Sequence, residues 1–326
     1  MITSIALYEG ASHDPYYNLA VEQCLLENVK EGQCVLYLWQ NQNTVVIGRN
    51  QNPWKECRTA LLDGEGGKLA RRMSGGGAVF HDLGNLNFTF LMPQDDYNLD
   101  RQLSVIQAAV RFFGISAEKS GRNDVLVNGR KFSGNAFYRN GRQAYHHGTL
   151  LVDVDMEKLG RYLNPSKAKL QAKGVDSVRS RVVNLKELCP ALTIGALKKA
   201  LAEAFCAVYG LPLEFLREEE LDTAAIEALA ARNRSWEWNF GQKLPFTFAC
   251  EDRFPWGDVQ IRLQVESGII RQATIYSDAM DCDLIPHWQA SLTGCRMEIA
   301  ALQAALKRHD CPETQDVCQM LLQNLT

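Results

Sequence analysis

The sequence predicts an α+β protein with antiparallel strands, flanking helices and a smaller second α+β unit at its C-terminus. Three observations carry this prediction. Apolar residues recur at helical spacing in several segments, for example over 193–209. Asn-Gly pairs at 128–129 and 140–141 are typical of tight turns between antiparallel strands. After about residue 243 the apolar residues alternate strictly and then give way to helical patterns.

Length and composition limit the class of protein. A chain of 326 residues is too long for one small core, so we expect a large domain over 1–243 and a small one over 244–326. Hydrophobic residues make up 46% and charged residues 22%, as in ordinary globular proteins. The net charge of −3 lacks the basic excess of a typical nucleic-acid binder, so no nucleic-acid partner is expected.

Cysteine usage and the N-terminus bear on location. The ten cysteines are scattered, none forms a CxxC pair, and none lies between Cys57 and Cys189. This pattern is typical of reduced thiols. The chain has no segment resembling a signal peptide and no apolar run long enough to span a membrane. We therefore expect a cytoplasmic protein without a membrane partner.

The elements of the large unit follow in order. Asp14-Pro15 is a favourable helix start. Strands are expected at 35–39 and 44–47, paired through the polar turn 41–43. In the stretch 86–90, apolar residues alternate with Asn87 and Thr89, which predicts one buried and one polar face. A helix is expected near 103–113.

The two Asn-Gly pairs predict a three-stranded antiparallel meander over 124–127, 130–138 and 143–152, with type I′ turns. Helices are expected over 193–209 and 223–232. In the small unit, strands are expected at 259–265 and 269–276, with helices in the last forty residues.

The first candidate site is the run Arg71-Arg72-Met73-Ser74-Gly75-Gly76-Gly77-Ala78-Val79-Phe80-His81-Asp82. Three consecutive glycines are unfavourable in helices and strands, but they let a backbone approach a ligand closely. Two arginines before them supply forked donors suited to phosphate. Glycines alone would favour a flexible surface loop with solvated arginines, but the arginines and the following strand favour a phosphate site. Neither the P-loop pattern nor GxGxxG is present.

The second candidate is Lys131, two residues after the 128–129 turn on a predicted inner strand. Its ammonium could contact a carboxylate and an α-phosphate together and stabilise the charge as they join. Asp124 could pair with Lys131 or help to hold Mg²⁺. An exposed lysine at a sheet edge is the commoner arrangement, and only the neighbouring turns favour a site.

A third candidate is the adjacent pair His146-His147, whose side chains point to opposite faces of a strand and cannot chelate one metal together. Extrapolation from the 140–141 turn pairs 131 with 150 and places His146 on the Lys131 face. A β-bulge would place His147 there instead, so the choice stays open.

Several long segments together resemble the bacterial lipoate–protein ligases. These segments are RRMSGGGAVFHDLGN, GRNDVLVNGRKFSG, YHHGTLL, KGVDSVRSRVVNL and SWEWNFG, which cover nearly the whole chain in the family's order. The resemblance implies a biotin/lipoate ligase catalytic fold, with a mixed sheet flanked by helices. Met73 departs from the small polar residue of some members, beside the glycines rather than within them.

The resemblance also implies an activity: lipoate and ATP form lipoyl-AMP and pyrophosphate, and the lipoyl group then passes to a lysine amine. The carriers would be lipoyl domains of 2-oxoacid dehydrogenase complexes and the glycine-cleavage H protein, and Mg²⁺ would accompany ATP. Lys131 would contact the lipoyl carbonyl and the α-phosphate, and Asn123, Asp124 and His81 are candidates to support Mg²⁺ and ATP. The proposed ATP contacts are Arg72, Gly77, Ala78, Val79 and Phe80, and the proposed lipoate contacts are Gly75, Gly76, Ser133 and His147.

An acyl adenylate must be kept from water, so the site needs an apolar slot and a cover. Leu19 and Val21 are candidates for the slot because of their apolar character. The segment 165–183, rich in Lys, Ser and Gly, is the candidate cover and could meet an acidic carrier surface.

Three alternatives remain. An octanoyl- or lipoyl-transferase of the same fold needs a cysteine nucleophile and no ATP, and the lack of cysteine between Cys57 and Cys189 opposes it. A biotin ligase would differ in its preference for free biotin. A non-catalytic relative that only binds lipoylated partners has no need of Lys131 and an intact 72–80 segment.

Overall fold

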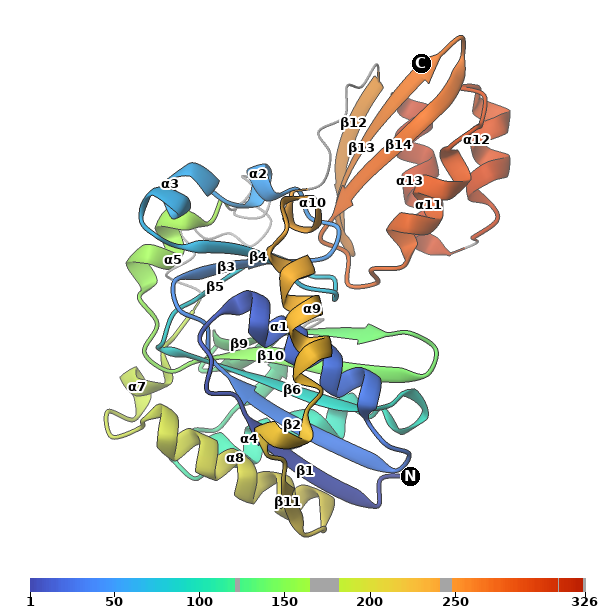
Figure 1. Ribbon diagram of the computed structural model, residues 1–326. Coiled ribbons are helices and arrows are strands. Elements are labelled where there is room, and N and C mark those ends of the chain that lie inside the picture. The colour runs from blue at the N-terminus through green and yellow to red at the C-terminus, as the bar shows by residue number, and fades with distance from the viewer. Residues whose placement is uncertain (121–123, 165–181, 241–247, 310, 325–326) are drawn as a thin grey trace.

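A mixed sheet forms the centre of the large unit in the computed structural model, which describes residues 1–120, 124–164, 182–240, 248–309 and 311–324 (Figure 1). Within these residues eight strands run in the order β11-β1-β2-β6-β10-β9-β8-β7. β1 pairs in parallel with β2 and β11, and the other neighbours are antiparallel. The strands are β1 Ser4–Glu9, β2 Gln33–Trp39, β6 Asn85–Pro93, β7 Glu118–Ser120, β8 Asp124–Val127, β9 Arg130–Arg139, β10 Gln143–Leu151 and β11 Leu213–Phe215.

Helices cover both faces of this sheet. α4 Leu99–Arg111 and α8 Ile194–Tyr209 pack on one face, where Phe88, Phe90 and Phe205 belong to one core. α1 Pro15–Asn28 and α9 Thr223–Arg234 pack on the other face, over a core that includes Tyr37 and Trp39. Short elements of the large unit are η1 Gln94–Asp96, α7 Leu185–Leu188, η3 Glu218–Glu220 and α10 Trp236–Asn239.

A second, three-stranded sheet lies beside the large one in the order β4-β3-β5. Its strands are β3 Thr44–Ile47, β4 Lys68–Arg71 and β5 Val79–His81, and α2 Pro53–Glu56, α3 Thr59–Gly64 and α5 Met156–Tyr162 flank it. Phe80 and Tyr162 pack at the centre of this layer, with ring centroids 5.4 Å apart. The glycine turn, residues 74–78, connects β4 to β5.

The C-terminal unit has its own antiparallel sheet, β12 Phe248–Phe254, β13 Gly257–Glu266 and β14 Ile269–Ser277. Three helices cover one side of it: α11 Leu284–Leu292, α12 Ile299–Leu306 and α13 Pro312–Gln323 (Figure 1). Trp288 is fully buried in its core. None of the helices in the described part of the chain combines the length and apolar character needed to cross a bilayer.

The predicted α+β class and the three-stranded meander are confirmed by β8, β9 and β10. The first turn is type I′ as expected, because Asn128 and Gly129 both have positive φ. The second turn differs. Only Gly141 has positive φ there, and the Asn140 side chain accepts N–H bonds from Arg142 and Gln143 at 3.0 and 2.8 Å. This longer turn pairs Arg139 with Ala144, two positions away from the expected register.

The expected pairing of strands 35–39 and 44–47 was wrong. Both strands exist, but β2 belongs to the large sheet and β3 to the small one. Asn41 anchors the crossing between them, because it is buried, accepts a bond from Asn18 at 2.9 Å and contacts His81 at 3.2 Å. A turn held from within in this way directs the chain out of the first sheet.

The alternation in β6 has a different meaning from the one expected. Asn87 and Thr89 do form a polar face, but α1 covers it, and both side chains are buried. Buried polar side chains need hydrogen-bond partners, so this face of the sheet is a candidate location for a ligand-binding site.

Candidate active site

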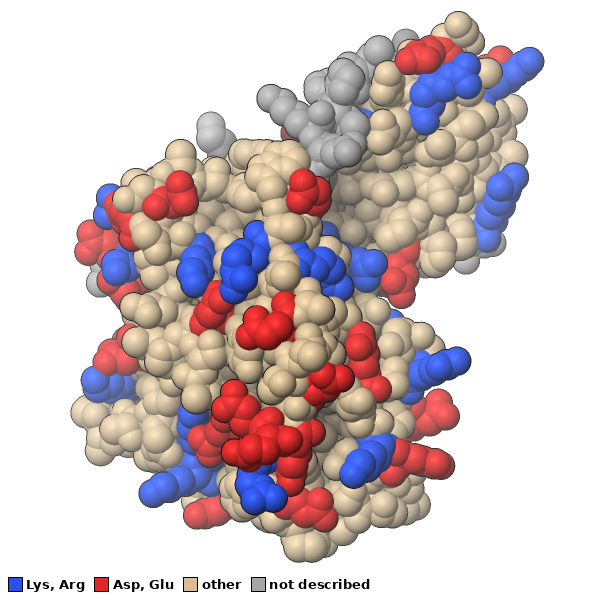
Figure 2. All heavy atoms as spheres, viewed as in Figure 1, with Lys and Arg blue, Asp and Glu red and all other residues tan. Residues whose placement is uncertain are grey.

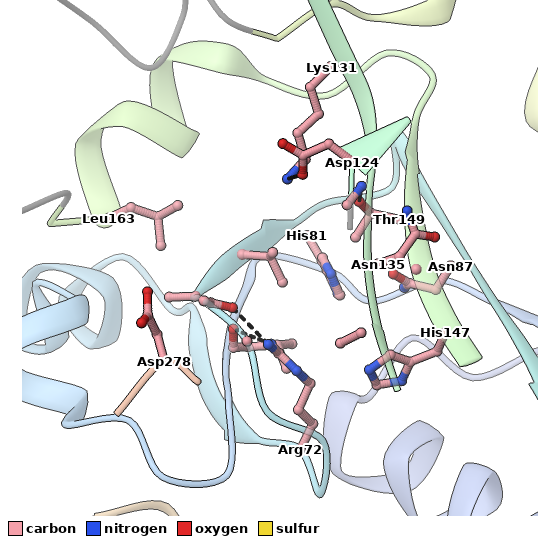
Figure 3. A pocket seen from close by; sticks show the side chains of 18 of the residues that line it. Arg72, His81, Asn87, Asp124, Lys131, Asn135, His147, Thr149, Leu163 and Asp278 are labelled. Atoms are coloured by element: carbon pink, nitrogen blue, oxygen red, sulfur yellow. Dashed lines mark hydrogen bonds and ion pairs between the residues drawn. The ribbon is translucent and has the colours of Figure 1, made fainter. Parts of the chain in front are cut away.

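A cavity of about 610 Å³ lies where the large sheet, the small sheet and the C-terminal unit meet (Figure 3). One side is formed by the α1-covered face of the large sheet, and the opposite side by β3, the glycine turn and β5. The described residues that line it and enter the argument are Leu19, Trp39, Arg72, Gly76, Gly77, Ala78, Val79, His81, Asn87, Asp124, Lys131, Gly134, Ala136, His147, Arg253, Asp278 and Met280.

Lys131 reaches this cavity from β9. Its Nζ lies 2.7 Å from Asp124 Oδ1 on β8, and its side chain is 32% exposed. A Cβ at Gly134 would lie 2.7 Å from Lys131 Nζ, so the missing side chain leaves room for the ammonium. The backbone of Lys131 is held as well, because its carbonyl accepts a bond from Val183 N at 2.9 Å. The result is a positioned cation at one wall of the cavity.

A β-bulge decides which histidine shares this wall. Ser133 pairs with Val125 and Lys131 with Leu126, so Phe132 is an extra residue in β9. The extra residue brings Lys131 onto the same face as Gly134 and Ala136, and Ala136 pairs with His147. His147 therefore lines the cavity, and the strict-register expectation for His146 was wrong.

Arg72 determines the shape of the glycine turn. Its Nη2 donates to the carbonyls of Gly75 and Gly77 at 2.7 and 2.8 Å, and its Nε donates to Ser74 Oγ at 3.0 Å. Burial lowers the pKa of Arg72 to about 10, so the guanidinium stays charged at neutral pH. Gly76 has a φ of +86°, which a residue with a side chain adopts only under strain.

Arg71 corrects the expectation of a pair of phosphate-binding arginines. Its guanidinium donates to five backbone carbonyls, those of Gly48, Arg49, Gln51, Trp238 and Asn239, at 2.6–3.1 Å. It is not among the cavity-lining residues. Arg71 thus fastens the loop after β3 to α10, and its donors are not available to a phosphate.

A buried hydrogen-bonded chain connects the two sides of the cavity. His147 Nδ1 lies 2.8 Å from Glu22 Oε1, and His147 Nε2 lies 2.8 Å from Ser74 Oγ in the glycine turn. Glu22 also accepts a bond from Thr89 Oγ1 at 2.7 Å, and Thr89 accepts one from Trp39 Nε1 at 3.1 Å. Because a carboxylate only accepts, His147 donates through Nδ1, and the ring orientation is fixed from both ends.

His81 presents an unused donor to the cavity. Its Nδ1 faces the Asn41 amide at 3.2 Å, and its buried Nε2 has no hydrogen-bond partner among the described residues. Burial, with smaller effects of Arg72 and His147, lowers the pKa of His81 to about 3. A neutral ring that accepts at Nδ1 carries its proton on Nε2, which can donate to a bound molecule.

Some predicted site residues lie elsewhere. Val21 lines a separate cavity of about 160 Å³, away from Leu19. Ser133 and Phe80 are buried and are not among the lining residues, and Phe80 packs on Tyr162. Gly75 faces the C-terminal unit. Asn123 and most of the predicted cover, 165–181, lie outside the described residues.

The prediction missed two kinds of residue. Trp39, Asn87 and Ala136 could have been found, because they alternate on the strand faces that carry Thr89 and His147. Arg253, Asp278 and Met280 of the C-terminal unit also line the cavity. No local motif marks these three, because only the packing of the two units brings them there.

Acidification is expected to destabilise the fold through two buried histidines. Burial lowers the pKa of His81 and of His146 from 6.5 to about 3. The unfolded chain gains each proton as the pH falls through 6.5, whereas the folded chain does not. Stability is therefore lost below pH 6.5, by about 2 kcal/mol per histidine at pH 5. Urea unfolding at pH 7 and pH 5 measures this loss.

His146→Gln should reduce the difference between the free energies of unfolding at pH 7 and pH 5 by about 2 kcal/mol. His13→Gln, at an exposed histidine, serves as the matched control and should leave the difference unchanged. Equal pH dependence in both variants would contradict the assignment of His146 as a buried neutral ring.

Comparisons with known proteins agree with this architecture. Residues 14–206 match the family described as lipoyl protein ligase A/B catalytic domain, and residues 243–321 match the bacterial lipoate protein ligase C-terminus. The structure of Plasmodium falciparum LipL1 in complex with lipoate is 27% identical and has a TM-score of 0.88. That match covers 98% of this chain and 100% of LipL1.

Two further structures lack a counterpart to part of the chain. A bipartite lipoate protein ligase with its E2 lipoyl domain, from Thermoplasma acidophilum, is 25% identical over 76% of this chain and 100% of that chain, with a TM-score of 0.62. A lipoate-protein ligase A bound with ATP is 24% identical over 74% of this chain and 99% of that chain, with a TM-score of 0.62, and this likeness concerns the fold alone.

A large catalytic unit of this fold with an appended C-terminal unit defines the class of lipoate–protein ligases. The chain belongs to the lipoyl protein ligase A/B catalytic domain family.

Proposed function

We propose that this protein is an ATP-dependent lipoate–protein ligase. It joins lipoate to ATP to give lipoyl-AMP and pyrophosphate, and it then transfers the lipoyl group to the ε-amine of a carrier lysine. The observation that carries the proposal is that Lys131 and the glycine turn line one cavity. Relatives described in complex with lipoate and bound with ATP support the choice of substrates.

The acyl chain is assigned to the part of the cavity between Leu19, Trp39, Ala136 and His147. These side chains are mainly apolar, which suits a hydrocarbon chain ending in a dithiolane ring. The hydrogen-bonded chain from Trp39 to Ser74 keeps Trp39 and His147 in place, so the slot is formed before the ligand enters.

The reacting atoms are assigned to the space beside Lys131. The lipoate carboxylate attacks the α-phosphorus of ATP, the bond to the β-phosphate oxygen breaks, and pyrophosphate leaves with the electron pair. Lys131 would contact the lipoyl carbonyl and the α-phosphate, where its charge stabilises the transition state. The His81 Nε2–H is a further donor at the cavity surface, and the backbone of Gly77, Ala78 and Val79 is proposed to hold the nucleotide. Arg72 supports these contacts by shaping the turn.

The residues are compatible with Mg²⁺ brought in by ATP. In the described residues no cluster of three or more His, Cys, Asp or Glu side chains could hold a metal ion. Mg²⁺ in such sites uses one or two carboxylates together with phosphate oxygens and water. Asp124 lines the cavity next to Lys131 and is the proposed carboxylate. Bound there, the ion would neutralise phosphate charge.

The acceptor is proposed to be a lipoyl domain of a 2-oxoacid dehydrogenase complex or the H protein. A relative is described together with its E2 lipoyl domain. Figure 2 shows Lys and Arg side chains in a band near the joint of the two units, whereas acidic side chains gather around η3. An acidic carrier is expected to approach the basic band. We assign the reacting centre of both half-reactions to residues 1–243 and an accessory role at the cavity wall to 244–326.

A pyrophosphate-release assay tests the proposal. Release should require both lipoate and ATP, and addition of an apo lipoyl domain should then give a lipoylated lysine detectable as a mass increase. Biotin in place of lipoate should give little release. Release that does not depend on lipoate, or a preference for biotin, would overturn the proposal.

An ATP-independent acyltransferase is disfavoured because none of the ten cysteines is among the residues lining the described cavity. The sulfur of Cys57 is also a poor nucleophile, since burial raises its pKa to about 12. Transfer of octanoate from an acyl carrier protein without ATP would reverse this conclusion.

A further inference from the structure

The C-terminal unit forms part of the cavity wall through direct contact with the glycine turn. Gly76 N donates to the carbonyl of Ala279 at 3.2 Å. A Cβ on Gly75 would lie 2.2 Å from Ala279 O and 2.6 Å from Met280 O. A glycine at 75 is therefore needed for the backbone of the C-terminal unit to come this close. The same segment places Met280 and Asp278 in the cavity lining.

Specific bonds on both sides of this contact hold the two units together. The backbone carbonyl of Asn50 accepts a hydrogen bond from Ser277 N at 2.8 Å. The Asn50 side chain donates from Nδ2 to the carbonyl of Cys282, also at 2.8 Å. Lys55 Nζ lies 3.0 Å from Glu251 and 3.5 Å from Asp258. The docked position of β12 is thus set by directional contacts, and Arg253 on β12 faces the cavity at a defined place.

Arg253 forms a long ion pair with Asp278 that leaves one of its N–H groups without a hydrogen bond in the described part of the chain. Its Nη1 is buried and has no hydrogen-bond partner among the described residues. The nearest carboxylate oxygen, Asp278 Oδ2, is 3.9 Å away, beyond hydrogen-bond distance. The other oxygen of Asp278 accepts a bond from Asp258 N at 2.7 Å, which fixes the carboxylate. The ion pair with Asp278 is long, and it leaves the buried Nη1 without a hydrogen bond to any described residue, so a bound anion is a suitable acceptor for this N–H group.

The position of this donor indicates which anion it takes. Figure 3 places Asp278 across the cavity from His147, which lines the acyl slot, and apart from Lys131. An anion at Arg253 would therefore lie away from the acyl chain. Since Lys131 is assigned to the α-phosphate, the groups left for Arg253 are the β- and γ-phosphates. Asp278 would repel them, but ATP arrives with a divalent cation that offsets this repulsion.

We propose that Arg253 of the C-terminal unit binds the β- and γ-phosphates of ATP and stabilises the leaving pyrophosphate. This inference rests on the proposed ligase function. Lipoyl-AMP formation then depends on Arg253, whereas transfer from lipoyl-AMP to the carrier involves no β-phosphate and does not need this residue. A change at Arg253, which lies far from the glycine turn in the sequence, would thus affect the first half-reaction and not the second.

The test compares Arg253→Gln with Arg271→Gln. Arg271 lies on β14 of the same sheet, is about half exposed and faces Glu266 at 3.7 Å, so it is a matched control. Arg253→Gln should raise the KM for ATP and the inhibition constant of pyrophosphate by about tenfold, the effect of losing one charged hydrogen bond of about 1.4 kcal/mol. The KM for lipoate should not change. Arg253→Lys should restore part of the loss.

Two measurements separate a direct contact from a structural effect. Calorimetric titration should give weaker ATP binding in Arg253→Gln but unchanged AMP binding, and transfer from chemically made lipoyl-AMP to an apo lipoyl domain should keep its rate. If the ATP parameters equal those of Arg271→Gln, or if AMP binding and transfer fall as well, the inference is wrong. Should the unmodified protein release no pyrophosphate with lipoate and ATP, the proposed function itself fails.

Discussion

Replacing Lys131 with alanine is expected to slow lipoyl-AMP formation by at least about 10²-fold, because the change removes a positive charge from the place where charge develops. Lys131 is partly exposed and its carboxylate partner is Asp124, so the fold should tolerate the change. The measurement is a single-turnover assay with labelled ATP and saturating lipoate. Lys131→Arg should retain part of the rate, because it keeps the charge but not the compact ammonium.

Lys119→Ala is the matched control. Lys119 lies on β7, which adjoins β8, and it pairs with Asp100 at 3.0 Å on the surface. Its replacement should leave the rate of adenylate formation unchanged. If Lys131→Ala and Lys119→Ala behave alike, Lys131 does not act at the reacting centre, and the assignment of the cavity must be revised.

Arg72→Met is expected to destabilise the protein by about 3 kcal/mol, because it leaves buried carbonyls of the glycine turn without donors. The guanidinium bonds both Gly75 and Gly77, so the turn should lose its shape and the KM for ATP should rise with it. Urea unfolding gives the stability change, and pyrophosphate release gives the KM.

Two further variants, one intermediate and one control, test the reason for this effect. Arg72→Lys keeps the charge but cannot reach both carbonyls, and it should lie between the native protein and Arg72→Met. Arg111→Met, at an exposed position on the last turn of α4, should have little effect on either quantity. An Arg72→Met variant with native stability and a raised KM would mean that Arg72 serves the ligand alone and not the turn.

Local sequence patterns predicted much of the fold. The meander was predictable because the two Asn-Gly pairs and the strand pattern between them are close together in the sequence. β13, β14 and the C-terminal helices were predictable for the same reason, whereas β12 was not among the predicted strands. The strands that pair with β3 could not be predicted, because periodicity identifies a strand but not its neighbour. Buried Asn41, which is bonded to Asn18, directs the chain into another sheet.

The candidate site likewise has features that local sequence patterns predicted and features that depend on distant residues. The glycine turn and Lys131 were recognisable as residue types unusual for their surroundings, and they line one cavity. Glu22, which orients His147, lies 125 residues away along the chain and carries no motif. Arg71 and Arg72 look alike in the sequence, and both donate to backbone carbonyls, yet only Arg72 borders the cavity. Only the register, with its bulge at Phe132, assigned the two histidines to their faces.

The separate cores of the two units have a consequence for heat denaturation. Among the described buried residues, the core around Trp288 contains side chains from the C-terminal unit alone. Within the described residues this core shares no side chain with the cores of the large unit, so the melting of one unit does not require the melting of the other. Calorimetry of the free protein should resolve two endotherms. A nucleotide held by both Arg253 and Lys131 would link the two units, and the endotherms should then move together towards one cooperative transition.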